Sequence, residues 1–247
     1  ERIDLPSLKA DRRAVLPGGL AILYTLAAHF DIRELFAAKG ALRQGVIIDL
    51  HERLEAHRRA RPGDMRDASV RELQQRFGVD LPQARRVGTI ALALFDAVCP
   101  QADADQRREL AWACDLHEMG LMVSHHDHHR HSAYLLAHVD APGFSQSQQR
   151  RVGELVLGQR GGLRKVEASL AQEPYAWQVL CLRLAVIKCH ARSEVSTSAL
   201  TLQGSGREAH LGFSARWAEL HPRTTFLLAE EAEFWARSGT LRLLMPA

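Results

Sequence analysis

The sequence predicts a mainly α protein, in which an all-α helical domain precedes a small α+β domain with a mostly antiparallel sheet. Three observations predict this class. Apolar residues recur at helical spacing between about residues 69 and 192, and the segments that carry them have capping residues at their starts and Gly or Pro at their ends. Beyond Ser193 the apolar period changes to two. With 247 residues, of which 46% are hydrophobic, the chain is long enough to bury a substantial core.

Three segments follow from composition and periodicity, and we expect domains over residues 1–55, 56–195 and 196–247. The first has a Pro-Gly-Gly break at residues 17–19 and then an apolar helical run. A short strand is expected within 32–40, and a strand or a buried helix start around 46–50. The polar stretch "HRRARPGDMRD" then serves as a linker.

Helix starts in the middle segment are predicted from capping residues. Ser69 with Glu72 forms a capping box for a helix that stops near Gly78, and Asp80 begins the helix that Pro100 ends. The next helix is expected to begin at Asp105 and to end at Gly120, and another to run from the histidine-rich stretch to Val139. Two further helices are expected, one that begins at Ser145 with Gln148 and one that spans Tyr175 to Arg192.

The last segment alternates apolar and polar residues, which is typical of short strands. Strands are predicted at "SALTLQ", "EAHLGF", "TTFLLA" and "TLRLLM", the first two forming a hairpin around Gly204-Ser205-Gly206. Short helices are predicted at "SARWAELH" and "EEAEFWARS".

The composition restricts location and partners. No apolar run reaches the roughly 18 residues needed to span a bilayer, and the first residues do not resemble a signal peptide, so we expect a cytoplasmic protein without a membrane partner. The four cysteines lack the paired spacing of zinc or redox motifs and are expected to be free and buried. A net charge of +3 does not indicate specific nucleic-acid binding. Arg supplies nearly all the positive charge, which reflects either phosphate binding or a compositional habit of the source genome.

Six motifs, taken in order, resemble the C-terminal half of the exopolyphosphatase and guanosine pentaphosphate phosphatase family (Ppx/GppA). They are "LPGGLAIL", "GALRQGV", "RFGVDLPQARRV", "LHEMGL", "HHRHSAYLL" and "DAPGFSQSQQ". The resemblance implies an HD-like helical domain and, over residues 1–55, a remnant of the second actin-like lobe. The phosphate-binding loops, the catalytic carboxylate and the Mg²⁺ site belong to the N-terminal half of such enzymes, so no cofactor is expected in this chain and Mg²⁺ is expected in the full-length enzyme.

His117 and Glu118 are the candidate catalytic residues. HD-domain hydrolases hold a metal ion with a lone His, a His-Asp pair on the next helix and a distant Asp, and the resemblance places His117 and Glu118 at that pair. His117 shares an apolar face with Leu110, Ala113 and Cys114, so it is expected to point inward. The position of the lone His falls near Gln83, which is a poor metal ligand. Where relatives of the family have a His before an Arg, this chain has Gln159-Arg160, and Asp140 is the remaining candidate for the last Asp. No metal site is therefore expected. His117 is either a hydrogen-bonded core residue or a group that orients or protonates a phosphate chain.

Two further groups are candidates for phosphate binding. His125, His129, Arg130 and His131 match the family pattern within "SHHDHHRH", whereas His126, Asp127 and His128 depart from it and are interpreted as incidental. A surface site for a transition metal and a solvated helix surface are the alternatives for this stretch. The second group surrounds a Gly-Gly turn, where closely spaced cations could hold successive phosphates or simply form a surface loop. Its members are Arg160, Arg164 and Lys165.

These observations favour an accessory region of an exopolyphosphatase-type phosphohydrolase, which binds polyphosphate or guanosine pentaphosphate, forms a homodimer and has no complete active site of its own. Full-length relatives release phosphate from these substrates, whereas this chain alone is expected to be inactive. Two alternatives stay open: an independently active HD-type metal-dependent phosphohydrolase that uses His117 and Glu118, and a purely structural or protein-binding module.

Overall fold

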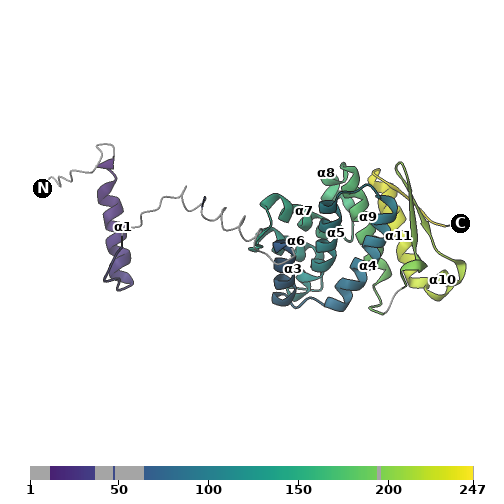
Figure 1. The fold of residues 1–247 in the computed structure, drawn as a ribbon, viewed down its shortest axis with the longest axis horizontal. Coiled ribbons are helices and arrows are strands. Elements are labelled where there is room, and N and C mark those ends of the chain that lie inside the picture. Colours follow the sequence, from purple (N-terminus) through teal and green to yellow (C-terminus); the bar gives the residue numbers. More distant parts are fainter. Residues whose placement is uncertain (1–11, 37–46, 48–63, 194–195, 247) are drawn as a thin grey trace. The chain divides into compact units, whose positions relative to one another are not determined.

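The computed structural model describes residues 12–36, 47, 64–193 and 196–246. The chain divides into two compact units, Glu1–Glu52 and Arg53–Ala247. Figure 1 shows the helices of each unit, which are described separately below.

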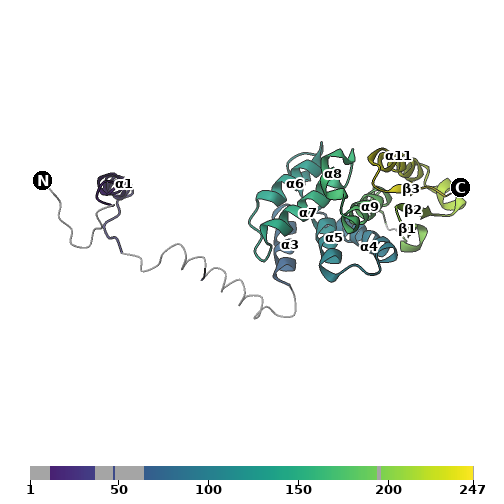
Figure 2. The same ribbon diagram turned by 90° about the horizontal axis from the view of Figure 1, so that it is seen from above.

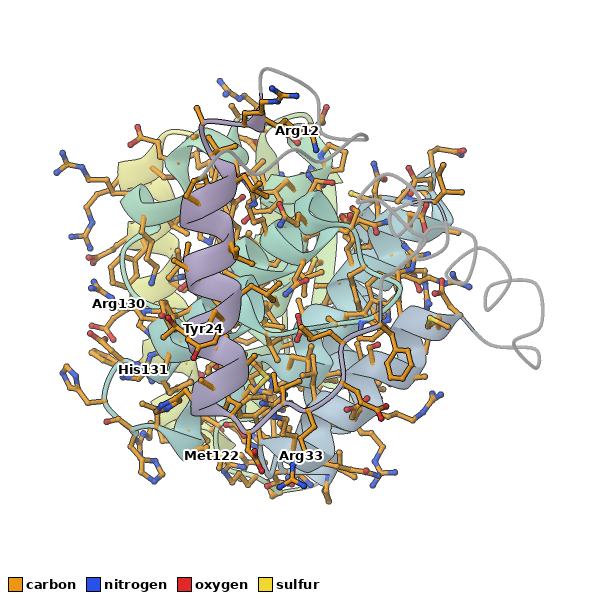
Figure 3. The ribbon with its side chains drawn as sticks, turned by 90° about the vertical axis from the view of Figure 1, so that its left-hand side faces the viewer. Arg12, Tyr24, Arg33, Met122, Arg130 and His131 are labelled. Carbon is orange, nitrogen blue, oxygen red and sulfur yellow. The ribbon has the colours of Figure 1, made fainter. Side chains whose placement is uncertain are left out.

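The first unit contains helix α1, Leu16–His29, which begins with Pro17 in its first turn as expected from the Pro-Gly-Gly break. None of its side chains is buried, and Tyr24, labelled in Figure 3, is 73% exposed. Residues 32–36 form neither helix nor strand, which contradicts the strand expected there. The rest of that expected strand lies outside the described residues, as does the segment around 46–50 apart from Ile47, which is helical.

The second unit is built mostly of helices. Figure 2 shows helix α9 with α3, α6, α7 and α8 on one side, and α11 and the strands on the other. Most residues of α9 are buried, on all sides of the helix, and α9 contacts α4, α5, α7 and α11, as expected of a helix at the centre of a core. The helices before the sheet are α3 Met65–Arg76, α4 Leu81–Val98, α5 Ala104–Leu116, α6 His128–His138, α7 Gln146–Gly158, α8 Glu167–Leu170 and α9 Glu173–Lys188, with 3₁₀ turns η2 Met119–Met122 and η3 Leu163–Val166.

Two of the predicted helix starts are confirmed. The Asp80 carboxylate accepts a hydrogen bond from the Gln83 N–H at 3.0 Å and caps α4. Ser145 and Gln148 form the expected capping box of α7, in which the Gln148 N–H donates to Ser145 Oγ and the Ser145 N–H to Gln148 Oε1.

Two other starts are wrong. Asp64 caps α3, whereas Ser69 lies inside that helix and its buried hydroxyl donates to the Pro142 carbonyl at 2.6 Å. Asp103 caps α5 in place of Asp105, because Gln106 at the third helical position completes a capping box with it. An N-cap residue needs non-helical, extended backbone angles, whereas Ser69 and Asp105 lie within the helices and have helical angles.

The sheet has the order β1-β2-β3 and is mixed rather than purely antiparallel. β1 Thr201–Ser205 and β2 Glu208–Gly212 form the predicted hairpin, with Leu202 opposite Leu211. β3 Arg242–Leu244 runs parallel to β2, with Ala209 opposite Leu243. A parallel neighbour requires a crossover, and helices α10 Ala215–Leu220 and α11 Pro222–Ser238 provide it.

The strand predicted at "TTFLLA" is wrong, because these residues form the start of α11. Pro222 stands in the first turn, and the buried residues that follow recur at helical spacing. These buried residues are Thr224, Leu228, Glu231 and Trp235. The mainly α class is nevertheless confirmed.

One hydrophobic core joins the helices to the sheet. It includes Val179 and Leu180 of α9 together with Leu202, Ala209 and Trp235 of the C-terminal segment. The four cysteines are free, and burial raises the pKa of the buried Cys114 and Cys181 thiols. Among the described residues, no helix combines the length and the apolarity needed to cross a membrane.

Candidate functional site

A cavity of about 540 Å³ in the second unit brings together His117, Glu118, His129 and Arg160, four of the nine candidate site residues. Its walls come from α4, the end of α5, the first turn of α6, the end of α7, α9 with the residues after it, and α11. Its polar and charged lining side chains are Gln83, His117, Glu118, Asp127, His128, His129, Gln159, Arg160, Arg183, His190, Arg192, Glu230 and Glu231.

His117 follows the last turn of α5 and is 1% exposed, so the predicted inward orientation is confirmed. Its Nδ1 lies 2.6 Å from the Cys114 carbonyl. A carbonyl only accepts, so Nδ1 carries the proton in this arrangement. The other ring nitrogen, Nε2, is buried and has no hydrogen-bond partner within the part of the chain that the structure describes. Burial lowers the pKa of His117, which favours the neutral ring.

Glu118 is oriented by Arg192. The Nη2 of Arg192 donates to Glu118 Oε1 at 2.6 Å, and its Nη1 donates to Asp80 Oδ2 at 2.7 Å. Glu118 Oε2 is buried, and none of the described residues forms a hydrogen bond with it. His117 Nε2 lies 4.0 Å from Glu118 Oε1. Burial opposes the charge of Arg192, but its hydrogen bond to Glu118 and the charge of that carboxylate outweigh this effect and raise the pKa of Arg192. Arg192 has a φ of 54°, unusual for a side chain with a Cβ, so this geometry is held against local strain.

The backbone at His117 is held from two sides. Its carbonyl accepts from Gln159 Nε2 at 2.8 Å and from the Ser132 hydroxyl at 3.1 Å, while Ser132 Oγ accepts from the Gly120 N–H at 2.7 Å. Gly120 packs so closely on the first turns of α6 that a Cβ there would lie 2.2 Å from the His128 carbonyl oxygen. The end of α5 and the start of α6 are therefore locked together around His117.

Both glutamines that depart from the HD pattern line the same cavity as His117 and Glu118. Gln83 Nε2 donates to the Cys189 carbonyl at 2.9 Å, and Gln159 Nε2 donates to the His117 carbonyl. Both side-chain amides therefore hold backbone carbonyls in place. Asp140 is exposed after α6 and does not line this cavity. Within the described parts of the chain, no three His, Cys, Asp or Glu side chains are grouped as metal ligands.

Of the predicted phosphate ligands, His129 and Arg160 line the cavity. His129 is 4% exposed, and its Nδ1 has no hydrogen-bond partner. Burial, with a smaller contribution from the charge of Lys165, lowers the pKa of His129 to about 4. Lys165 Nζ donates to the Arg160 carbonyl at 2.5 Å, and burial together with the charge of Arg183 lowers the pKa of Lys165 to about 8. Lys165 thus lies behind this wall without lining the cavity itself.

The remaining predicted ligands lie elsewhere. His125 is exposed and His131 half-buried, and neither lines the cavity. Arg130 is exposed, with its Nε 3.6 Å from Asp127 Oδ2, and Figure 3 shows it at the surface of α6. Arg164 lines a separate cavity of about 430 Å³ that also includes Phe234. The structure therefore does not bring the seven predicted phosphate ligands into one group.

Several lining residues were missed by sequence reasoning. Asp127 and His128, interpreted as incidental, both line the cavity, and His128 is 9% exposed with its Nδ1 3.5 Å from Arg160 Nη1. On the opposite wall Arg183 binds both carboxylate oxygens of Glu231, with 2.6 Å between Arg183 Nη2 and Glu231 Oε2. An arginine in the middle of an apolar helix was the available signal for this pair, because a buried charge needs a partner.

Fold and site together define a mainly α protein with a cavity lined by imidazole, guanidinium and carboxylate groups. Residues 65–232 match the model of the Ppx/GppA phosphatase family, domain III. The match covers more than half of the chain, from the start of α3 into α11, and the chain therefore belongs to the Ppx/GppA phosphatase family. The resemblance found in the sequence is confirmed.

Proposed function

We propose that this chain is an accessory region of an exopolyphosphatase-type phosphohydrolase and that its 540 Å³ cavity binds polyphosphate or guanosine pentaphosphate. The observation that supports the proposal is the convergence of His117, His128, His129 and Arg160 on one cavity. Arg160 contacts no carboxylate within the described part of the chain, so its guanidinium is available for a phosphate oxygen. The volume falls in the usual range for small-ligand sites.

Binding rather than turnover is assigned to this chain. Gln83 stands near the lone-His position of the HD pattern, and Gln159 stands where relatives have a His before an Arg. Both glutamines use their amide nitrogen to hold a backbone carbonyl. The chemistry would then belong to the lobe that carries the catalytic carboxylate and Mg²⁺ in full-length relatives. Homodimerisation is part of the same proposal and rests on the family resemblance.

The test is calorimetric binding of polyphosphate and of guanosine pentaphosphate to the 247-residue chain at low and high salt. We expect affinity to fall steeply with salt, because bound phosphates release counterions from the chain and from the ligand. Arg160→Gln should weaken binding several-fold and reduce the salt dependence. Arg107→Gln is the matched control, since Arg107 pairs with Asp96 and does not line the cavity. Equal affinities for wild type and Arg160→Gln would contradict the location, and no binding at low salt would contradict the function.

A second candidate is an independently active HD-type phosphohydrolase. The observation that favours it is the pair of buried, unpartnered atoms His117 Nε2 and Glu118 Oε2 on one wall of the cavity. This candidate requires that the isolated chain release phosphate with Mg²⁺ or Mn²⁺ and that both EDTA and His117→Ala abolish the release. We expect no turnover with either ion.

A further inference from the structure

The charges around the cavity do not suit an anion as they stand. The lining contains three guanidinium groups, four carboxylates and four imidazoles: Arg160, Arg183 and Arg192; Glu118, Asp127, Glu230 and Glu231; His117, His128, His129 and His190. With neutral imidazoles the three positive and four negative charges leave one net negative charge. A phosphate ligand would then meet net repulsion. Each protonated imidazole adds one positive charge to the same wall.

Two of these imidazoles also have an unused ring nitrogen. His117 Nε2 and His129 Nδ1 are buried and have no hydrogen-bond partner among the described residues. Because Nδ1 of His117 carries the proton, the unpartnered Nε2 of the neutral ring is an acceptor. A phosphate oxygen is an acceptor as well, so the two cannot form a hydrogen bond until the ring gains a second proton. Protonation therefore supplies both the missing charge and the missing donor.

The charged neighbours of His117 have opposing effects on its pKa. Glu118 and Asp80 favour its protonated form and Arg192 opposes it, but burial is the largest effect and lowers its pKa. For His128, burial again dominates and lowers the pKa, and Arg160 adds to this effect. Glu118 and a hydrogen bond with the backbone of His125 favour protonation of His128, whereas His117 opposes it.

His129 faces Lys165, Arg160 and His128, which oppose its protonation, and Asp127, which favours it. His190 differs from the other three, because its Nε2 lies 3.0 Å from Thr224 Oγ1 and is thus already partnered. Burial and the charge of Arg223 lower the pKa of His190. Before a ligand binds, all four imidazole rings are therefore mainly neutral at neutral pH.

We infer that this cavity binds phosphate together with protons, which the imidazoles of His117, His128 and His129 accept as the anion enters. This inference rests on the function proposed above and adds its regulation: affinity is high in mildly acidic solution and falls as pH rises.

The direction of the pH dependence and its pH range follow from the pKa values of the imidazoles in the free and the bound protein. In the free protein the pKa values lie below the ordinary 6.5, at about 4 for His129. A bound anion favours the imidazolium and raises the pKa values of these three rings. Protons are taken up between the free and the bound pKa, so within that range affinity decreases by about tenfold per pH unit for each proton. At pH values above the bound pKa the rings stay neutral, and binding is weakest.

The test uses trimetaphosphate, a cyclic phosphate whose charge does not change over this pH range, so that any proton uptake belongs to the protein. Isothermal titration calorimetry at several pH values, in buffers of different ionisation enthalpy, measures affinity and the number of protons taken up. We expect uptake of about one proton or more at pH about 5.5, and a loss of affinity of at least about tenfold between pH about 5.5 and about 7.5. His117→Gln and His129→Gln should each reduce the uptake, whereas the exposed His138, which is not part of the lining, serves as the control in His138→Gln.

The wild-type measurement needs no variant, so a poorly folding His117→Gln protein does not prevent the test. Binding without proton uptake, at an affinity independent of pH but weakened by Arg160→Gln, overturns this inference and keeps the proposed function. Uptake that persists unchanged in His117→Gln, in His128→Gln and in His129→Gln also overturns the assignment to these rings. Failure of trimetaphosphate, polyphosphate and guanosine pentaphosphate to bind at any pH overturns the proposed function, and this inference with it.

Discussion

Gly120 is the residue around His117 that has the least room for an added side chain. A Cβ at this position would lie 2.2 Å from the His128 carbonyl oxygen and 2.4 Å from the Ser132 nitrogen, both of which are backbone atoms of α6 that cannot turn aside. Gly120→Ala should therefore destabilise the fold by about 2 to 3 kcal/mol and displace the first turn of α6. Urea denaturation followed by circular dichroism measures the loss.

Gly162→Ala is the matched control, because a Cβ there meets no atom within 4 Å and Gly162 has a negative φ of −62°. Its stability should stay close to that of wild type. A Gly120→Ala protein as stable as Gly162→Ala would show that α6 can move away from η2 without loss. The tight packing around His117 would then have no energetic consequence.

At the scale of single elements, the start of α5 tests the corrected helix boundary. Asp103 Oδ1 accepts from the Gln106 N–H at 2.7 Å, whereas Asp105 lies inside the helix with only its exposed carboxylate near Arg66. Asp103→Ala should cost about 1 kcal/mol of unfolding free energy, because a helix N–H loses its partner. Asp105→Ala should cost clearly less, since exposed ion pairs contribute little. The reverse order in thermal or urea denaturation would restore the boundary expected from the sequence.

For the second unit as a whole, the Arg183 and Glu231 pair joins α9 to α11. Both side chains are at most 4% exposed, Arg183 Nη1 also donates to the Gly158 carbonyl at 2.8 Å, and Trp235 Nε1 donates to Glu231 Oε1 at 2.6 Å. Glu231→Gln leaves the guanidinium charge buried without a counter-charge and should destabilise the unit by about 3 to 5 kcal/mol. Chemical denaturation monitored by tryptophan fluorescence checks this value.

Glu233→Gln is the comparison within the same helix. Glu233 pairs with Arg237 one turn away, but both side chains are at least 67% exposed, so its loss should leave stability near that of wild type. Equal stabilities of Glu231→Gln and Glu233→Gln would mean that the buried pair does not hold the C-terminal segment on α9. A large loss for Glu231→Gln alone, in a single transition, agrees with the continuous core.

Local patterns in the sequence were enough for the fold class, for the caps at Asp80 and Ser145, and for the inward orientation of His117. Caps and apolar faces depend on neighbours a few residues away, so the sequence contains this information directly. The same patterns misplaced the starts of α3 and α5, because a capping motif can also occur inside a helix or compete with one two residues earlier.

The cavity itself was decided by tertiary structure. It brings Gln83 of α4, His117 after α5 and Glu231 of α11 onto one surface, although the first and last of these are separated by most of the second unit's sequence. No local pattern specifies which loops meet, and so neither the inclusion of His128 nor the exclusion of His125 and Arg130 could be predicted. Residue spacing determined which side chains turn inward, whereas the packing of α9 against α4, α7 and α11 determined which of them face one another.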